Sequence, residues 1–211
     1  MTINLATLTN AIRSKSRDPE MTPILASTIL SGGIKNIPEL LGQAFHESGH
    51  LSVYTENLNY SADALVSKFS RSRISLEDAD RYGRTSKHPA DQRMIANTLY
   101  GGAWGKKNLG NTQPDDGWHF RGVGPIQLTG RANITRFAKW VGDLELIANP
   151  SRIATERATG AKALIWYWTI YKPCNEAGSN VAEITRLVTG SPRQGYDQRM
   201  ALTKHFRSLL A

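Results

Sequence analysis

One stretch of sequence decides the fold, Ala44-Phe45-His46-Glu47-Ser48-Gly49-His50-Leu51, because it ends an apolar helix at a carboxylate. Apolar residues in and before it fall on one arc when each residue turns by about 100 degrees: Ile37, Leu40, Leu41, Ala44, Phe45 and Leu51. Glu47 lies on the edge of that arc. A carboxyl group half sunk against apolar neighbours is costly to ionise, which suits a general acid. The pattern predicts a helix that begins after Asn36 and carries an acid.

A second carboxylate, Glu56, follows nine residues after Glu47. An unbroken helix would carry Glu56 roughly 13 Å along its axis and about half a turn away, too far to share a substrate. We therefore expect the chain to turn after about Leu51 and to run extended through Val53-Tyr54-Thr55, where β-branched and aromatic residues favour such a conformation. Among polar neighbours, Glu56 is expected to stay ionised and to activate a water. Carboxylates in two such settings are typical of glycoside hydrolysis; the alternative is two ordinary solvent-facing charges.

The same letters satisfy a zinc motif, because His46-Glu47-Ser48-Gly49-His50 reads HExxH. On a continuous helix, His46 and His50 would share a face opposite the apolar arc and Glu47 would act as the base. Glycine inside the motif weakens that helix. No remaining histidine stands at a recognised spacing for a third ligand; these are His88, His119 and His205. We expect no metal and no other cofactor, and keep the zinc site as an alternative.

Composition bounds the class of protein. The length of 211 residues suits one domain, perhaps of two lobes, with a real core. Lys and Arg number 26 against 18 Asp and Glu, which gives a net charge of +8 and a pI near 9.7. A basic surface favours polyanions such as nucleic acid, anionic membranes and bacterial walls. The sequence has no basic run or nucleic-acid motif, which argues against specific nucleic-acid recognition. Four basic residues of the C-terminal helix are expected to face solvent, with contact to an anionic wall as the alternative: Arg199, Lys204, His205 and Arg207.

Cysteine usage and the N-terminal sequence bear on the compartment. The single cysteine, Cys174, excludes an internal disulfide framework and is expected to fill the core of a protein folded in a reducing cytoplasm. The opening Met1-Thr2-Ile3-Asn4 is followed by no positive cluster, long apolar run or cleavage signal, so we expect no signal peptide. The apolar stretches are too short to span a bilayer.

Helical patterns dominate the rest of the chain. Two short helices are expected within 3–35, a group of helical pieces at about 61–99, and further helices at 131–141, 155–171, 180–188 and 196–209, with 163–170 at the core. Residues 101–124 are rich in glycine and are predicted to be loops. Trp104, Trp118 and Arg121 within them are suited to stacking on and hydrogen bonding with sugars. The alternative is that both tryptophans are buried anchors.

One segment, Gly122-Val123-Gly124-Pro125-Ile126-Gln127-Leu128-Thr129-Gly130-Arg131-Ala132-Asn133, closely resembles the GRGPxQLT/S segment of family 19 glycoside hydrolases. This chitinase-like family includes many phage endolysins. The upstream His-Glu-Ser-Gly agrees with it, and Ala90–Gly102 resembles its phage and bacterial branch. The resemblance covers about residues 37 to 200.

The resemblance implies roles for five residues. Glu47 would donate a proton to the leaving sugar oxygen, and Glu56 matches the second carboxylate. Thr129 falls where the family uses a hydroxyl to position the attacking water, and Gln127 and Asn133 fall on substrate-contacting amides. Family members invert the anomeric centre, which requires carboxyl groups roughly 6.5 to 9.5 Å apart.

Two departures from the family pattern concern the substrate. Val123 stands where the family commonly has arginine, so one polar contact is in doubt. Arg186 and Thr189 align with a stretch that is rich in asparagine in plant members, which favours a substrate containing N-acetylmuramic acid over plain chitin. Trp104, Arg121 and Arg186 complete the expected substrate-binding residues.

The resemblance implies a mainly α, lysozyme-like helical fold, with a large lobe and a smaller helical lobe at about 61–99 around a catalytic cleft. We expect residues 1–211 to form a single catalytic domain without a separate wall-binding domain. The expected activity is hydrolysis of the β-1,4 bonds between N-acetylmuramic acid and N-acetylglucosamine for host lysis. A chitinase, a zinc-dependent peptidoglycan peptidase, a lytic transglycosylase and a non-catalytic wall-binding module are the alternatives.

The same reading sets expectations for partners. The protein would be a monomer that binds glycan strands and no nucleic acid. It would accumulate in the host cytoplasm and reach the wall through holes made by a holin-type membrane protein.

Overall fold

The structure is a computed structural model that describes residues 3–211. Within this range the chain is helical, with no sheet and only isolated β-bridges, such as those joining Thr55 to Val123 and Val123 to Leu128. The mainly α fold class is therefore confirmed. The chain divides into two compact units. The first unit contains the residues up to Tyr54, Gly124–Gln127 and Ser151–Ala211, and the second contains Thr55–Val123 and Leu128–Pro150.

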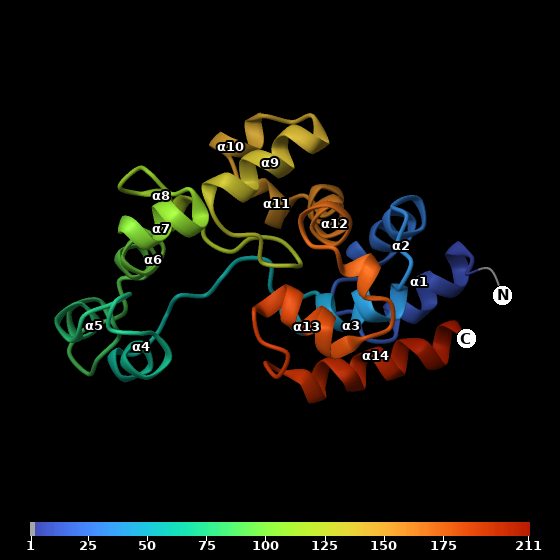
Figure 1. Ribbon diagram of the computed structural model, residues 1–211, viewed down its shortest axis with the longest axis horizontal. Helices are drawn as coiled ribbons and strands as arrows, with labels where there is room; N and C mark the ends of the chain where they lie inside the picture. The colour runs from blue at the N-terminus through green and yellow to red at the C-terminus, as the bar shows by residue number, and fades with distance from the viewer. Residues whose placement is uncertain (1–2) are drawn as a thin grey trace. The chain divides into compact units, whose positions relative to one another are not determined.

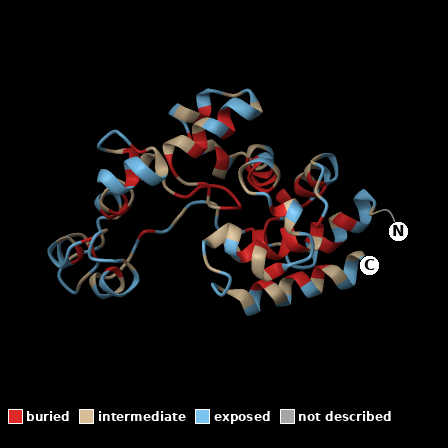
Figure 2. Ribbon diagram, viewed as in Figure 1, coloured by how far each residue is buried: buried red, intermediate tan, exposed pale blue. Residues whose placement is uncertain are grey.

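The first unit is built around α3. Its elements are α1 (Leu5–Arg13), α2 (Met21–Ser31), α3 (Ile37–Glu47), α11 (Arg152–Thr155), α12 (Arg157–Trp166), the π-helical η1 (Tyr167–Tyr171), the 3-10 helix η2 (Cys174–Ala177), α13 (Val181–Thr189) and α14 (Tyr196–Leu210). Helix α3 packs along α14 and touches α13, while α2 packs against α1 and α12 (Figure 1). Figure 2 shows α3 buried along most of its length. Phe45 on α3 meets Phe206 on α14 edge to face, 4.9 Å between ring centroids.

The start of α3 is anchored by Asn36 in a way that the sequence did not predict. Asn36 occupies the N-cap position, yet its side chain makes no capping bond to the helix. Its amide instead donates to the carbonyls of Cys174 and Gly178, and its oxygen accepts the indole N–H of Trp168 at 2.8 Å. Cys174 fills the core as expected, and burial raises the pKa of its thiol to about 12.

The second unit holds α4 (Ala62–Lys68), α5 (Leu76–Tyr82), α6 (Gln92–Tyr100), α7 (Gly102–Leu109), α8 (Asp116–His119), α9 (Arg131–Val141) and α10 (Glu145–Ala148). Side-chain oxygens of Ser61, Ser75 and Asp91 cap α4, α5 and α6 by accepting N–H groups of their first turns. A buried apolar cluster joins these three helices and consists of Leu58, Leu65, Ile74, Ala79, Ile95, Ala96 and Leu99.

The prediction that 101–124 is all loop is wrong, because α7 and α8 lie within it. Glycine brackets α7 rather than breaking it: Gly102 has φ 59° at its start, and Gly110 ends it with φ 68°. The segment before α9 is fixed by Asp116, which is 2% exposed and accepts bonds from the backbone of Thr112 and from the guanidinium of Arg131.

None of the helices described between residues 3 and 211 is both long and apolar enough to cross a membrane.

Candidate active site

Helix α3 ends directly after Glu47 because the next residues form a helix-terminating turn. Gly49 is left-handed with φ 56°, and the N–H of His50 donates to the carbonyl of Phe45 at 2.7 Å. This six-to-one bond, with the longer bond from Gly49 N–H to the His46 carbonyl, is the Schellman arrangement for which glycine is favoured. Glu47 therefore sits on the last turn of α3.

The turn corrects the zinc interpretation. His46 is on α3, whereas His50 lies beyond its end with φ 68°, so the two imidazoles do not share a helix face. Gly49, which argued against a continuous helix through the zinc motif, lies in the turn that ends α3. Among residues 3–211 no three His, Cys, Asp or Glu side chains are grouped as metal ligands.

After the turn the chain reverses, as the spacing predicted. Buried Leu51 also has positive φ, 60°, a conformation that a bulky residue adopts only when its surroundings impose it. The N–H groups of Ser52 and Val53 both donate to the carbonyl of Ser48 at 2.9 Å. The hydroxyl of Ser48 donates to the carbonyl of Ala44. Backbone and side-chain hydrogen bonds of Ser48 therefore fix the turn that follows α3.

Arg199 of α14 is the main partner of Glu47, and the prediction that it faces solvent is wrong. Its side chain is 1% exposed, and its Nη2 donates to Oε1 of Glu47 at 2.5 Å. Its Nη1 donates to the amide oxygen of Gln43, and its Nε to the carbonyl of Gln194. Each nitrogen of the buried guanidinium thus has an acceptor, as it needs because an unpaired buried charge is very costly.

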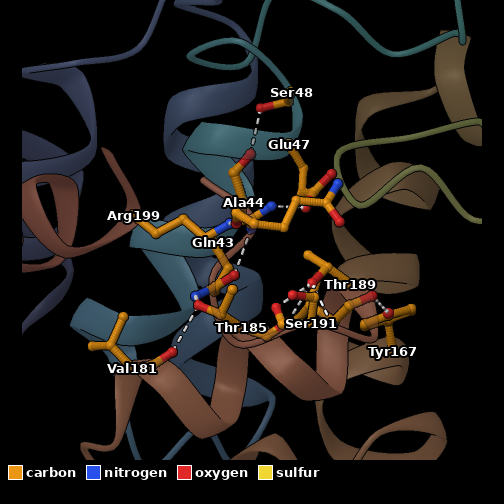
Figure 3. A network of polar contacts seen from close by, with 12 residues as sticks. Gln43, Ala44, Glu47, Ser48, Tyr167, Val181, Thr185, Thr189, Ser191 and Arg199 are labelled. Atoms are coloured by element: carbon orange, nitrogen blue, oxygen red, sulfur yellow. Dashed lines mark hydrogen bonds and ion pairs between the residues drawn. The ribbon is translucent and has the colours of Figure 1, made fainter. Parts of the chain in front are cut away.

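The network extends from Arg199 through Gln43 to α13. Gln43 is fully buried and donates its amide to the hydroxyl of Thr185, which donates to the carbonyl of Val181 (Figure 3). Figure 3 shows Arg199 and Gln43 beside Glu47, so three helices contribute to the orientation of this carboxylate. Burial and the positive charge of Arg199 also lower the pKa of His46, the residue before Glu47.

Glu56 is held in the second unit by a different set of donors. Its backbone N–H donates to the carbonyl of Gly122 at 2.9 Å, and the N–H of Gly122 donates back to Oε2 of Glu56 at 3.2 Å. The hydroxyl of Tyr100 donates to Oε1 at 2.5 Å. The bridge from Thr55 to Val123 places Glu56 in an extended segment, as expected from Val53-Tyr54-Thr55.

The negative charge of Glu56 shifts the pKa values of two tyrosines and an arginine in the second unit. Burial and then the carboxylate of Glu56 raise the pKa of Tyr100 and of Tyr60. Burial lowers the pKa of Arg121, and Glu56 offsets part of that effect. Each carboxylate thus has its own setting: Glu47 accepts a bond from a buried guanidinium, and Glu56 accepts bonds from a hydroxyl and a peptide N–H.

Similarity to known proteins bears on the family of the chain. No protein-family model matches the chain. A curated relative, the "Glycosyl hydrolase family 19 domain-containing protein" of Haemophilus influenzae strain Rd, is 33% identical over 171 residues, which are 81% of this chain and 76% of that protein. The chain belongs to glycosyl hydrolase family 19. It is therefore a glycoside hydrolase, an enzyme that acts on a glycan.

Further relatives of this family 19 hydrolase are chitinases by name. The acidic 27 kDa endochitinase of Solanum lycopersicum is 33% identical over 92 residues, 44% of this chain and 36% of that protein. The crystal structure of chitinase C from Streptomyces griseus HUT6037 has a TM-score of 0.57 at 16% identity, covering 99% of this chain and 92% of that one. A bacterial family 19 chitinase has a TM-score of 0.58 at 17% identity, covering 99% and 95%. The two structures support the lysozyme-like helical fold.

The predicted site residues of this family 19 hydrolase divide between the two units. The first unit contains Glu47, Gln127 and Arg186, and the second contains Glu56, Thr129, Asn133, Trp104 and Arg121. Gln127 has φ 54°, which is unusual for a residue other than glycine and is often found at functional sites. Thr129 is half-buried, and its carbonyl accepts the buried amide of Asn133 at 2.8 Å.

The other expected substrate contacts are partly engaged within the protein. The guanidinium of Arg73 lies 3.3 Å from the ring centre of Trp104, which is 39% exposed. Arg121 stacks on Trp118 at 3.7 Å, and Trp118 packs on the apolar core of the second unit. Arg186 is exposed and pairs with Glu183 one turn earlier on α13. Trp118 is thus an anchor, while Trp104 keeps an exposed edge.

Two residues that contact the candidate carboxylates were not predicted from the sequence, Arg199 and Tyr100. Arg199 is separated from Glu47 by 152 residues, and no local pattern distinguishes it from its basic neighbours. Tyr100 lies inside the stretch Ala90–Gly102 that resembles the family, which is the one signal that pointed to it.

Proposed function

We propose that this hydrolase is an endolysin that cleaves the β-1,4 bonds between N-acetylmuramic acid and N-acetylglucosamine in peptidoglycan, with Glu47 as general acid and Glu56 as general base. The proposal depends on the difference between the hydrogen-bond donors to Glu47 and those to Glu56. Oε1 of Glu47 accepts a bond from the buried guanidinium of Arg199, while the two oxygens of Glu56 accept bonds from a hydroxyl and a peptide N–H. Paired carboxylates in unlike settings are what an acid and a base in one reaction require.

The proposed reaction conserves protons and inverts the anomeric carbon. Protonated Glu47 transfers its proton to the glycosidic oxygen as the bond from C1 to that oxygen breaks. Glu56 accepts a proton from a water, and the water oxygen bonds to C1 on the opposite face. Glu47 is left ionised and Glu56 protonated, and exchange with solvent restores both. Since Arg199 occupies Oε1 of Glu47, Oε2 is the oxygen that carries the proton.

The net charge of +8 supports peptidoglycan as the substrate, because a basic enzyme is attracted to an anionic wall. Arg186, in a stretch that is rich in asparagine in plant members, adds a cation on α13 that suits a carboxylate-bearing sugar. A chitinase acting on N-acetylglucosamine polymers is the second candidate, because the plant relatives are named endochitinases. Thr129, Gln127 and Asn133 are proposed to contact water and sugar in either case.

The biological setting is part of the proposal. The enzyme would accumulate in the host cytoplasm as a monomer and pass to the wall when a holin-type membrane protein opens the inner membrane. It would bind glycan strands and not nucleic acid. Expression of the chain with and without a holin tests the route, since lysis without any membrane lesion would contradict it.

Analysis of the reaction products tests the activity. Purified peptidoglycan and, separately, chitin oligosaccharides are digested, and the products are reduced with borohydride and identified by mass spectrometry. Reduced muramic acid ends support the proposal, and reduced glucosamine ends from peptidoglycan would show a glucosaminidase. Turnover of chitin oligosaccharides alone would favour the chitinase. Anhydro ends or free peptide amines would overturn the two-carboxylate mechanism.

A further inference from the structure

Tyr100, the last residue of α6, holds one oxygen of Glu56, and the Gly122 peptide holds the other. The Tyr100 hydroxyl is 2.5 Å from Oε1, and the Gly122 nitrogen is 3.2 Å from Oε2. Donors on both oxygens prevent the carboxylate from rotating about its last bond. A carboxylate has about four lone-pair sites, so two bonds leave acceptor sites free for a water.

The Tyr100 hydroxyl keeps its proton over the working range of the enzyme. Burial, and then the negative charge of Glu56, raise the pKa of Tyr100 well above its ordinary value. Tyr100 is therefore always a donor toward Glu56.

The backbone on both sides of Tyr100 is braced. The carbonyl of Leu99 accepts bonds from both Nε and Nη2 of Arg73, whose guanidinium also stacks on Trp104 at 3.3 Å. The carbonyl of Tyr100 accepts the amide of Asn111 at 2.9 Å. Because α6 and α7 are joined here through Gly101 alone, these contacts set the direction of the tyrosine ring.

We propose that Tyr100 is a positioning residue for the reaction: it orients Glu56 toward the attacking water, and the Arg73 and Asn111 contacts hold Tyr100 in place. The proposal rests on the proposed role of Glu56 as the base. Because the Tyr100 hydroxyl contacts the base, its effect is expected on kcat rather than on KM.

Tyr100→Phe retains the ring and its packing and removes only the donor. We expect kcat to fall by about 10- to 100-fold with KM little changed, the range for one hydrogen bond to a charged group. The fall of kcat on the acid side is expected to begin at a higher pH, because the lost bond favoured the charged carboxylate. Loss of packing alone would not move the pH profile. Tyr82→Phe, in the same apolar core, is the matched control.

A double-mutant cycle with Glu56→Ala separates this inference from the proposed function. Tyr100→Phe is expected to lower kcat in the wild-type background and to leave the azide-rescued rate of Glu56→Ala unchanged, because the carboxylate that it orients is gone. Equal losses in both backgrounds, or an unchanged kcat in Tyr100→Phe while Glu56→Ala is inactive, would overturn the inference alone. Full activity of Glu56→Ala would overturn the proposed function. Circular dichroism and urea unfolding of each variant confirm that the fold persists.

Discussion

The guanidinium of Arg199 lies 2.5 Å from the carboxylate of Glu47 with only 1% of the arginine side chain exposed. This contact joins the last turn of α3 to α14 and makes the C-terminal helix part of the support for the candidate acid. A second ion pair joins the same two helices, between Arg207 and the buried carboxylate of Glu39. Variants of the two pairs can therefore separate the contribution of α14 to stability from its contribution to the orientation of Glu47.

We expect Arg199→Met to lower the free energy of unfolding by about 3 to 5 kcal/mol, because it leaves a partly buried carboxylate without its partner. It should also lower kcat at least tenfold, since the orientation of Glu47 is lost. Arg207→Met is the matched control on the same helix pair. It should also cost stability, because it leaves the buried carboxylate of Glu39 without its partner, but it should leave kcat unchanged. Urea unfolding and steady-state kinetics measure both; equal kcat values in the two variants would refute a role for Arg199 in orienting Glu47.

Glu47→Gln should abolish nearly all activity while the fold persists. The amide oxygen of glutamine still accepts the bond from Arg199, and glutamine has nearly the same size as a protonated glutamate, so the fold should persist. Activity on peptidoglycan should drop by about 10² or more, the contribution of a general acid. Retention of over about a tenth of the wild-type rate would contradict the assigned role.

Glu56→Ala should be inactive in buffer and recover activity in sodium azide. The small anion can occupy the space of the lost side chain and attack C1 without a base. Attack from the face opposite the leaving group gives an α-glycosyl azide, which proton NMR distinguishes from the β-anomer. A β-azide, or wild-type hydrolysis without azide, would show that Glu56 is not the base of an inverting enzyme.

His46 should make the protein less stable as the pH falls from about 7.5 to about 5.5. Burial and Arg199 lower the pKa of His46 in the folded protein. The unfolded chain therefore takes up a proton below about 6.5 while the folded protein does not, and stability is lost on acidification. His46→Gln should flatten this dependence in urea unfolding. An NMR titration of the His46 ring above its ordinary pKa would contradict it.

Gly42 allows α3 and α14 to approach each other. A Cβ at this position would lie 2.2 Å from the hydroxyl oxygen of Thr203. Gly42→Ala should therefore cost about 1 to 3 kcal/mol of stability. The Thr203 hydroxyl has no hydrogen-bond partner among residues 3–211, so Thr203→Ala should be nearly neutral alone and should restore part of the loss in the double variant. Additive losses in thermal unfolding would show that this close contact is not what limits the helix spacing.

The sequence predicted correctly those features that depend on neighbouring residues alone. The helix from Ile37 to Glu47 follows from its apolar arc, and the caps at Ser61 and Ser75 are where the sequence places them. The turn after α3 was expected, although at Leu51 rather than at Gly49. Helix α7 was missed because its glycines resemble those of a loop, and only the packing of 102–109 in its unit makes them helix boundaries.

The sequence by itself determined the helical fold class, the positions of Glu47 and Glu56 and, through the resemblance of residues 122–133, the family. Only the tertiary structure decided which side chains contact each carboxylate. Arg199 looked like one of several basic residues on a solvent-facing helix, and Tyr100 like an ordinary helix end. Periodicity specifies which face of a helix is buried but not which distant side chain meets it. Once packing removes water from Glu47 and Arg199, each must find a charged or polar partner, and that requirement pairs them.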